Sequence, residues 1–195
     1  MKAPRPALLT FDIFGTVLDW RAGHLRDAPS LGAEDFDRVV DRQGVLEQED
    51  PTRPYAEIVA RSLIEAGVAP ERAREIGANA GRWPLFADSR EGMRRLQGVA
   101  PCMALTNSDR AHGEQVQEQL GLRLADWQCA EEVHLYKPSE EVWRLAARRR
   151  RLAFGRPWWH VSAYADYDLE VARRLGLTCV FVERPHSRPG PFDVK

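Results

Sequence analysis

Short apolar runs alternate along the chain with longer segments whose apolar positions recur at helical spacing. Runs typical of buried strands lie at residues 7–11, 99–105, 127–129, 160–162 and 178–182. Segments typical of amphipathic helices lie at residues 33–48, 54–66, 70–82, 89–96, 110–120, 139–152 and 167–175. Strands that alternate with helices predict an α/β fold, in which helices cover both faces of a parallel sheet.

One stretch departs from this alternation. Residues 19–86 carry helical patterns separated by prolines and contain no convincing strand. We therefore predict a Rossmann-like parallel sheet core formed by residues 1–18 and 87–195, with a helical domain of residues 19–86 inserted into it. A chain of 195 residues is long enough to bury such a core without disulfide bonds.

Polar side chains follow the predicted strands at the edge where a parallel sheet binds its ligands. Asp12 and Thr106 come directly after the first two apolar runs, and residues 162–168 contain the polar groups after the fourth. Lys137 stands in a loop before a helix. Each of them alone is explained as an ordinary turn or cap residue. Ordinary turns do not predict that all four meet at one edge, so we expect a site there.

The composition excludes several classes of function. The 28 basic and 29 acidic residues almost cancel, so no excess charge favours nucleic acid or an anionic membrane. The basic run 148–151 is explained as the solvated end of a helix. No apolar run has the length of a membrane span or a secretory leader. Cys102, Cys129 and Cys179 lie without a C-x-x-C pair in apolar contexts, which is typical of free thiols in the cytoplasm.

Lysine is rare in this chain. The 28 basic residues comprise 25 arginines and three lysines, and Lys137 is the only lysine away from the two ends. A compact ammonium orients a carboxylate in a way that a guanidinium fork does not. This usage favours a specific role for Lys137 over a solvated one.

Four motifs occur in the order of a known superfamily. The segments FDIFGT at 11–16, LTNSD at 105–109, YKP at 136–138 and YADYDLEVARRLGL at 164–177 resemble the motifs of the haloacid dehalogenase superfamily. The resemblance extends over residues 7–185. It implies that residues 19–86 form the helical cap of that superfamily and that Asp12 is the nucleophile. Most members are phosphatases, so the details of the motifs decide the reaction.

Two of these details differ from the phosphatases. They carry an Asp two residues after the nucleophile, where this chain has Phe14, and a phenyl ring cannot protonate a leaving group. They also carry a carboxylate four or five residues before the match to Asp168, where this chain has Tyr164 and Ala163. The Asp-x-Phe-Gly-Thr pattern resembles the type II 2-haloacid dehalogenases. A halide leaves without a proton, and we expect neither a metal nor another cofactor.

The resemblance also implies a cap arginine that receives the leaving halide. The segment RQGVLE at 42–47 is similar to the pattern around that arginine and assigns the role to Arg42. Other cap arginines that the sequence leaves open are Arg21, Arg38 and Arg61. Trp143 stands where the pattern has tyrosine, and the segment 162–164 holds one extra residue before Asp168.

This resemblance implies a cofactor-independent hydrolase of small 2-haloalkanoic acids, and the cysteine usage predicts that it is cytoplasmic. Asp12 would displace the halide from C2 and form an aspartyl ester, whose hydrolysis gives a 2-hydroxy acid with inverted configuration. Lys137 would orient Asp12, and Asp168 would hold Lys137 and help to activate water. The predicted catalytic residues are Asp12, Thr16, Arg42, Thr106, Asn107, Lys137 and Asp168.

The remaining predicted residues would bind the substrate. Thr106 and the backbone N–H groups of Ile13 and Phe14 would hold its carboxylate, and Arg42 and Asn107 would stabilise the halide. The predicted substrate-binding residues are Ile13, Phe14, Gln43, Leu46, Trp143, Ser162 and Tyr167, of which Phe14, Leu46, Trp143 and Tyr167 would form an apolar wall.

Two other functions stay open at this point. A phosphatase with an unusual acid would release phosphate in the presence of Mg²⁺, and a catalytically idle member would bind a partner or ligand through its cap. The expected partner of the enzyme is the small 2-haloacid substrate. We expect neither nucleic acid nor a membrane as a partner, and a homodimer stays open.

Overall fold

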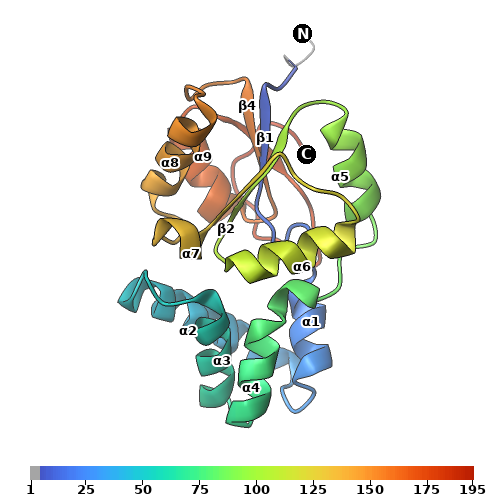
Figure 1. Cartoon of the computed structure of the whole chain (residues 1–195), viewed down its shortest axis with the longest axis vertical. Coiled ribbons are helices and arrows are strands. Elements are labelled where there is room, and N and C mark those ends of the chain that lie inside the picture. The colour runs from blue at the N-terminus through green and yellow to red at the C-terminus, as the bar shows by residue number, and fades with distance from the viewer. Residues whose placement is uncertain (1–4) are drawn as a thin grey trace.

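The computed structural model describes residues 5–195, except for the side chain of Ala33. Residues 1–4 of the predicted core segment 1–18 therefore lie outside the described residues. A sheet flanked by helices occupies one end of the molecule, and a group of helices occupies the other (Figure 1). Among the described residues, no helix has the length and apolar content that are needed to cross a membrane.

Within the described residues, the sheet has five parallel strands in the order β3-β2-β1-β4-β5. The strands are β1 (Leu8–Phe11), β2 (Cys102–Thr106), β3 (Asp126–Cys129), β4 (Trp158–Ser162) and β5 (Thr178–Phe181). The chain moves from β1 outward to β3 and then returns to the other side of β1 for β4 and β5. Asp12 follows β1 at the point where the strand order reverses, which is where open α/β sheets bind ligands.

Alternate side chains of β1 pack into two separate hydrophobic layers. Leu9 and Phe11 face the layer that includes α5 and α6, and Leu8 faces the layer that includes α8 and α9. These core helices are α5 (Ser89–Gln97), α6 (Arg110–Leu120), the short α7 (Ala130–Val133), α8 (Glu140–Arg150) and α9 (Glu170–Arg174). Helices thus cover both faces of a parallel sheet, which confirms the predicted fold class.

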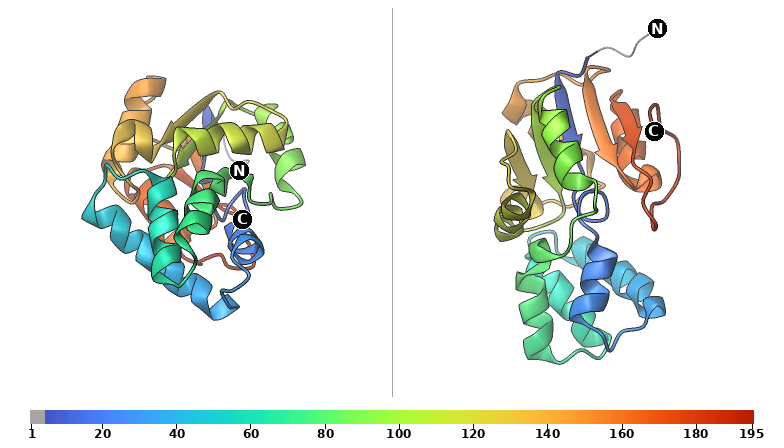
Figure 2. Two further views of the ribbon diagram at one scale, coloured as in Figure 1. Left: turned by 60° about the horizontal axis from the view of Figure 1, so that its bottom comes forward. Right: turned by 90° about the vertical axis from the view of Figure 1, so that its right-hand side faces the viewer.

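Four helices form the cap, which lies beyond the carboxyl ends of the strands (Figure 2). They are α1 (Trp20–Asp27), α2 (Ala33–Glu49), α3 (Tyr55–Glu65) and α4 (Pro70–Ala78). The chain enters and leaves the cap side by side, because the backbones of Leu18 and Leu85 pair with each other. The pattern over 70–82 predicts one helix, but α4 ends at Ala78, and a 3₁₀ turn follows over Ala80–Arg82.

The helix that the sequence predicts over 167–175 begins as a wider turn. A π-helical turn spans Ala165–Leu169, and α9 continues it. The N–H of Leu169 accordingly donates to the carbonyl of Tyr164, five residues earlier. A π turn holds more residues than an α turn. It therefore accommodates the extra residue in this motif while Asp168 remains fully buried.

Candidate active site

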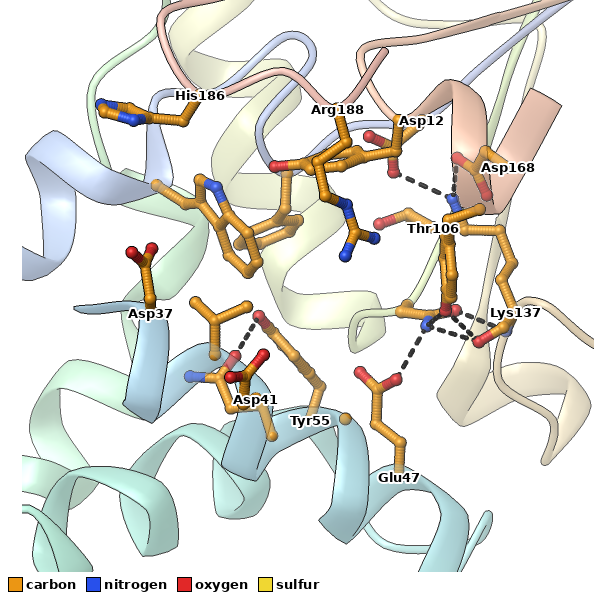
Figure 3. A pocket seen from close by; sticks show the side chains of 18 of the residues that line it. Asp12, Asp37, Asp41, Glu47, Tyr55, Thr106, Lys137, Asp168, His186 and Arg188 are labelled. Atoms are coloured by element: carbon orange, nitrogen blue, oxygen red, sulfur yellow. Dashed lines mark hydrogen bonds and ion pairs between the residues drawn. The ribbon is translucent and has the colours of Figure 1, made fainter. Parts of the chain in front are cut away.

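A pocket of about 490 Å³ lies between the carboxyl edge of the sheet and the cap (Figure 3). Helix α2 supplies its lower wall, and the loops after β1, β2 and β4 supply the upper one. Predicted site residues that line it are Asp12, Phe14, Gln43, Thr106, Asn107, Lys137, Tyr167 and Asp168. Pockets for drug-sized ligands have volumes of roughly 300–1,000 Å³. The pocket therefore has room for acids larger than a haloacetate.

Asp12 belongs to a buried network of four side chains. The ammonium of Lys137 donates to Oδ1 of Asp12 over 2.9 Å and to Oδ2 of Asp168 over 2.7 Å. The hydroxyl of Thr16 donates to Oδ2 of Asp12 over 2.6 Å and accepts a hydrogen bond from the backbone N–H of Ala163. Both oxygens of Asp12 are thus held in one orientation, while the carboxylate still lines the pocket.

Burial and neighbouring charges set the protonation of this network. Burial raises the pKa of Asp12 above its ordinary value, while the ammonium of Lys137 acts in the opposite direction. Burial also opposes the ionisation of Asp168, but Lys137 and the neighbouring His160 together outweigh this effect and lower the pKa of Asp168 to about 2. The two carboxylates raise the pKa of Lys137 despite its burial. The network therefore combines a permanent ammonium with a poorly hydrated carboxylate at Asp12, which favours nucleophilic attack.

Backbone N–H groups beside Asp12 are available to an anion. Among the described residues, no acceptor pairs with the N–H of Ile13, Phe14 or Asn107. Gly15 has a φ of 88°, and a Cβ at this position would lie 2.0 Å from the hydroxyl oxygen of Tyr164. Only glycine fits this turn, which exposes the preceding N–H groups. Such unpaired donors bind a carboxylate or an oxyanion.

Asn107 holds the loop that carries Lys137. Its Oδ1 accepts a hydrogen bond from the backbone N–H of Lys137 over 2.8 Å, and its Nδ2 lies 3.2 Å from the carbonyl oxygen of Lys137. The hydroxyl of Tyr167 donates to the same carbonyl. The amide of Asn107 therefore positions Lys137 in addition to lining the pocket, a role that the sequence does not predict.

Aromatic and amide side chains form the wall around Phe14. The ring of Phe14 meets the rings of Tyr55 and Trp83 edge-on, with centroids 5.4 and 5.9 Å apart. The hydroxyl of Tyr55 donates to Oε1 of Gln43 over 3.1 Å, and Nε2 of Gln43 donates to the hydroxyl of Ser62. The cap thus closes the pocket against an apolar group at Phe14 rather than against a second carboxylate.

The cap contributes a carboxyl group that sequence reasoning missed. Glu47 on α2 accepts a hydrogen bond from Nδ2 of Asn107 over 3.1 Å, and it pairs with no cation among the described residues. Its enclosure between cap and core raises the pKa of Glu47 to about 8, although Asn107 and Lys137 act in the opposite direction. At neutral pH, the carboxyl group is mostly protonated and offers a hydrogen-bond donor to the pocket.

Glu47→Gln is expected to make the free energy of unfolding less dependent on pH. Because folding raises the pKa of Glu47 to about 8, the stabilising contribution of its neutral form is complete below the unfolded pKa of 4.5 and is lost as the pH rises through 8. The loss amounts to at most about 1.4 kcal/mol per pH unit. Urea unfolding at several pH values measures the free energy of unfolding of both proteins. The difference between variant and wild type should shift in favour of the variant as the pH rises. Parallel curves would contradict the raised pKa.

Three further residues lie at or behind the site without a sequence signal that assigns them a role. Tyr164 packs against Gly15 beside Asp12, and the guanidinium of Arg188 lies 5.2 Å above its ring. Arg188 stands beyond residues 7–185, where the motifs end. His160 lies behind the network, with its Nε2 3.6 Å from Oδ2 of Asp168. Its place in β4 was predicted, but its contact with Asp168 was not.

The structure corrects the prediction for Arg42. Its Nε lies 2.6 Å from Glu65 and its Nη1 3.1 Å from Glu49, outside the pocket. Helical geometry explains this position, because Gly44 and Glu47 line the pocket and Arg42 projects to the other side of α2. The cap arginine that the motif resemblance implies is therefore absent from the pocket wall in the described residues.

Four predicted substrate-binding side chains also lie outside the pocket wall. Leu46 is fully buried in the hydrophobic core, and Trp143 packs against His160 in the layer of α8 and α9, so neither forms the apolar wall. Ser162 donates to Oδ2 of Asp168 over 3.1 Å, so it positions that carboxylate instead of contacting a substrate. The side chain of Ile13 is fully buried, so only its backbone N–H, next to Asp12, could contact a substrate.

The donor set does not fit a divalent metal ion. The ammonium of Lys137 bridges Asp12 and Asp168, and a metal would have to displace it to share their oxygens. Within residues 5–195, no group of three or more His, Cys, Asp and Glu side chains is arranged to hold a metal ion. Hard divalent cations require six or more oxygen ligands, including water. A reaction without metal remains a prediction.

Solved structures share this fold. The L-2-haloacid dehalogenase PA0810 is 26% identical over 94% of this chain and 87% of its own, with a TM-score of 0.82. The L-2-haloacid dehalogenase from Xanthobacter autotrophicus is 16% identical over 91% and 77%, with a TM-score of 0.74. The HAD-hydrolase YfnB from Bacillus subtilis, in a structure bound to magnesium, is 16% identical over 91% and 89%, with a TM-score of 0.72. No family model and no curated protein matches the sequence. The chain has the fold of the haloacid dehalogenase superfamily, in a form like that of its type II dehalogenases.

Proposed function

We propose that the protein hydrolyses 2-haloalkanoic acids to 2-hydroxy acids through an ester at Asp12. One observation carries the proposal: a carboxylate held by Lys137 and Thr16 faces a pocket in which Phe14 occupies the place of a phosphatase acid. The likeness to L-2-haloacid dehalogenases supports it. The hydrolase class rests on the same likeness.

In the first half of the reaction, a carboxylate oxygen of Asp12 attacks C2. The new C–O bond forms as the carbon–halogen bond breaks, and the halide leaves with the bonding electrons. Attack from the side opposite the halide inverts C2. The ammonium of Lys137 keeps Asp12 ionised and oriented during this step, and the N–H groups of Ile13 and Phe14 contact the substrate carboxylate.

In the second half, water attacks the ester carbonyl of Asp12. The oxyanion that develops is stabilised by the ammonium of Lys137 and by backbone N–H groups. Oδ1 of Asp168 is buried without a hydrogen-bond partner among the described residues, which supports a role for it as the acceptor of a hydrogen bond from the attacking water. One proton of this water passes to the departing alkoxide, and the other is released to solvent as Asp12 is regenerated.

A halide-release panel tests the function. It comprises fluoro-, chloro- and bromoacetate, both enantiomers of 2-chloropropionate, and 2-bromo acids with longer or aromatic side chains, since the pocket has room for them. We expect halide release from at least one acid, unchanged by exhaustive EDTA treatment. A folded protein that releases no halide would refute the proposed function.

A phosphatase is the second candidate, and Glu47 favours it. A carboxyl group with a pKa of about 8 on the cap side can donate the proton that a phosphate ester needs for its leaving oxygen. Mg²⁺-dependent phosphate release from a phosphomonoester panel, without halide release, would support this candidate. Inactivity in both panels would favour the remaining hypothesis, a catalytically idle protein that binds a partner or ligand.

A single-turnover experiment in ¹⁸O-water tests the covalent intermediate. With the enzyme in excess over substrate, the first 2-hydroxy acid should contain unlabelled oxygen from Asp12, because the attacking atom belongs to the carboxylate. Mass spectrometry of the product and of the peptide that contains Asp12 measures the label, which should appear in the peptide. A labelled product with an unlabelled peptide would instead indicate direct attack by water.

A further inference from the structure

The C-terminal segment returns to the pocket after the last strand. Beyond β5, Arg188 pairs through its backbone with the turn that carries Asp168. Its N–H donates to the carbonyl of Ala163 over 2.9 Å, and its carbonyl accepts a hydrogen bond from the N–H of Ala165 over 2.8 Å. These two bonds fix the backbone of Arg188 beside the catalytic network.

The side chain of Arg188 reaches into the pocket. Figure 3 shows its guanidinium in the space between Asp12 and the cap. The guanidinium carbon lies 5.2 Å from the ring centroid of Tyr164 and 5.7 Å from that of Tyr167, and Nε lies 3.2 Å from Asp166. Stacking on the tyrosines and this ion pair orient the fork. Its two terminal nitrogens make no hydrogen bond to another described residue.

The charges of the other pocket residues leave this guanidinium as the group that can attract an acidic substrate. Lys137 is shared between Asp12 and Asp168, so its charge is already balanced. The cap adds the acidic side chains Asp37 and Asp41 to the wall, and the carboxyl group of Glu47 beside them is mostly protonated. His186 lies at the exposed rim. A carboxylate that enters this pocket is therefore repelled, unless a cation with unpaired N–H donors binds it.

We propose that Arg188 binds the carboxylate of the substrate and restricts the pocket to acids. The inference rests on the proposed function, in which the substrate is a 2-haloacid. A guanidinium presents two parallel N–H donors that match the two oxygens of a carboxylate. The N–H groups of Ile13 and Phe14 reach the remaining lone pairs, which places C2 next to Asp12. The specificity residue is thus in the core, and the cap arginine Arg42 has no part in binding.

Kinetics of Arg188→Gln and Arg42→Gln test this assignment on an acid that the panel identifies. The carboxylate is charged in both the ground state and the transition state, so loss of its receptor raises KM and leaves kcat nearly unchanged. We expect KM of the Arg188 variant to rise about 10- to 100-fold. The Arg42 variant is the matched control, and its KM and kcat should stay within about twofold of wild type.

Three kinetic outcomes would overturn the inference. If kcat of Arg188→Gln falls at unchanged KM, the guanidinium acts on a charge that develops only in the transition state, such as the leaving halide. If neither parameter changes, Arg188 does not contact the substrate. If Arg42→Gln raises KM as much as Arg188→Gln, the cap arginine shares the role. Thermal unfolding confirms that both variants are folded.

A binding experiment separates this inference from the proposed function. Calorimetric titration with lactate, and with uncharged lactamide of similar shape, requires no turnover. Wild type should bind lactate at least about tenfold more tightly than lactamide, and Arg188→Gln should lose this preference. That result supports the inference even if no haloacid releases halide, in which case only the proposed function fails. Equal lactate affinities of wild type and variant would refute the inference even if the panel succeeds.

Discussion

Asp12→Asn is expected to lower haloacid turnover by about four orders of magnitude or more. An amide of nearly the same shape cannot form the ester, because it has no anionic oxygen. The fold should be retained, since burial disfavours the charge of Asp12 and the substitution removes that charge while Lys137 keeps Asp168 as its partner. Initial rates of halide release give kcat, and thermal unfolding gives the stability.

The matched control is Asp88→Asn. Asp88 is an exposed carboxylate at the start of α5 that pairs with Arg184, and its replacement should leave kcat at the wild-type value. Asparagine can deamidate to aspartate, so mass spectrometry of the Asp12 variant has to accompany the kinetics. Near-wild-type halide release by a preparation without deamidation would disprove the nucleophile.

Lys137→Met is expected to destabilise the protein by about 3–5 kcal/mol and to remove turnover. The methionine side chain fills the space of the lysine stem but leaves Asp12 and Asp168 facing each other without a cation. Two adjacent buried carboxylates raise the pKa of one of them, and a protonated Asp12 is no nucleophile. Urea unfolding near neutral pH measures the loss of stability.

The pH dependence of this variant has a definite sign. In the wild type, Lys137 is the main group that lowers the pKa of Asp168 to about 2, with His160 contributing. The resulting contribution to stability is present above the unfolded pKa of 3.8 and is lost as the pH falls through 2. In Lys137→Met, the raised carboxyl pKa makes stability fall as the pH rises. The double variant Lys137→Met/Asp168→Asn should recover stability but not turnover. Wild-type stability of Lys137→Met near neutral pH would contradict the bridging role.

Local patterns were sufficient to predict the core of the site. Residues 7–11 form an apolar run that only a buried strand explains, and β1 occupies Leu8–Phe11. The carboxyl ends of parallel strands share one edge, so the polar residues that follow them had to be neighbours. Asp12 and Lys137 are 125 positions apart in sequence and 2.9 Å apart in space.

Side chains on the cap were harder to place. The sequence defines α2 as a helix, but the side of α2 that faces the pocket depends on how the whole cap packs on the core. Arg42 and Glu47 lie on the same predicted helix within one motif. In the packed structure, Glu47 lines the pocket, whereas Arg42 faces away from it and pairs with Glu65. The predictions that Leu46 and Trp143 line the pocket were wrong for the same reason, because both side chains are buried against other helices.

The amino-acid sequence determined the strands and helices, the position of the proposed nucleophile and the absence of a carboxylate at Phe14, because these depend on short-range periodicity and residue identity. The tertiary structure alone decided the order of the strands, the presence of Arg188 in the pocket wall and the protonation of Glu47. Those properties depend on long-range contacts: Arg188 has no motif and reaches the pocket because its backbone pairs with Ala163 and Ala165. Likewise, the carboxyl group of Glu47 has a raised pKa only where the cap encloses it against the core.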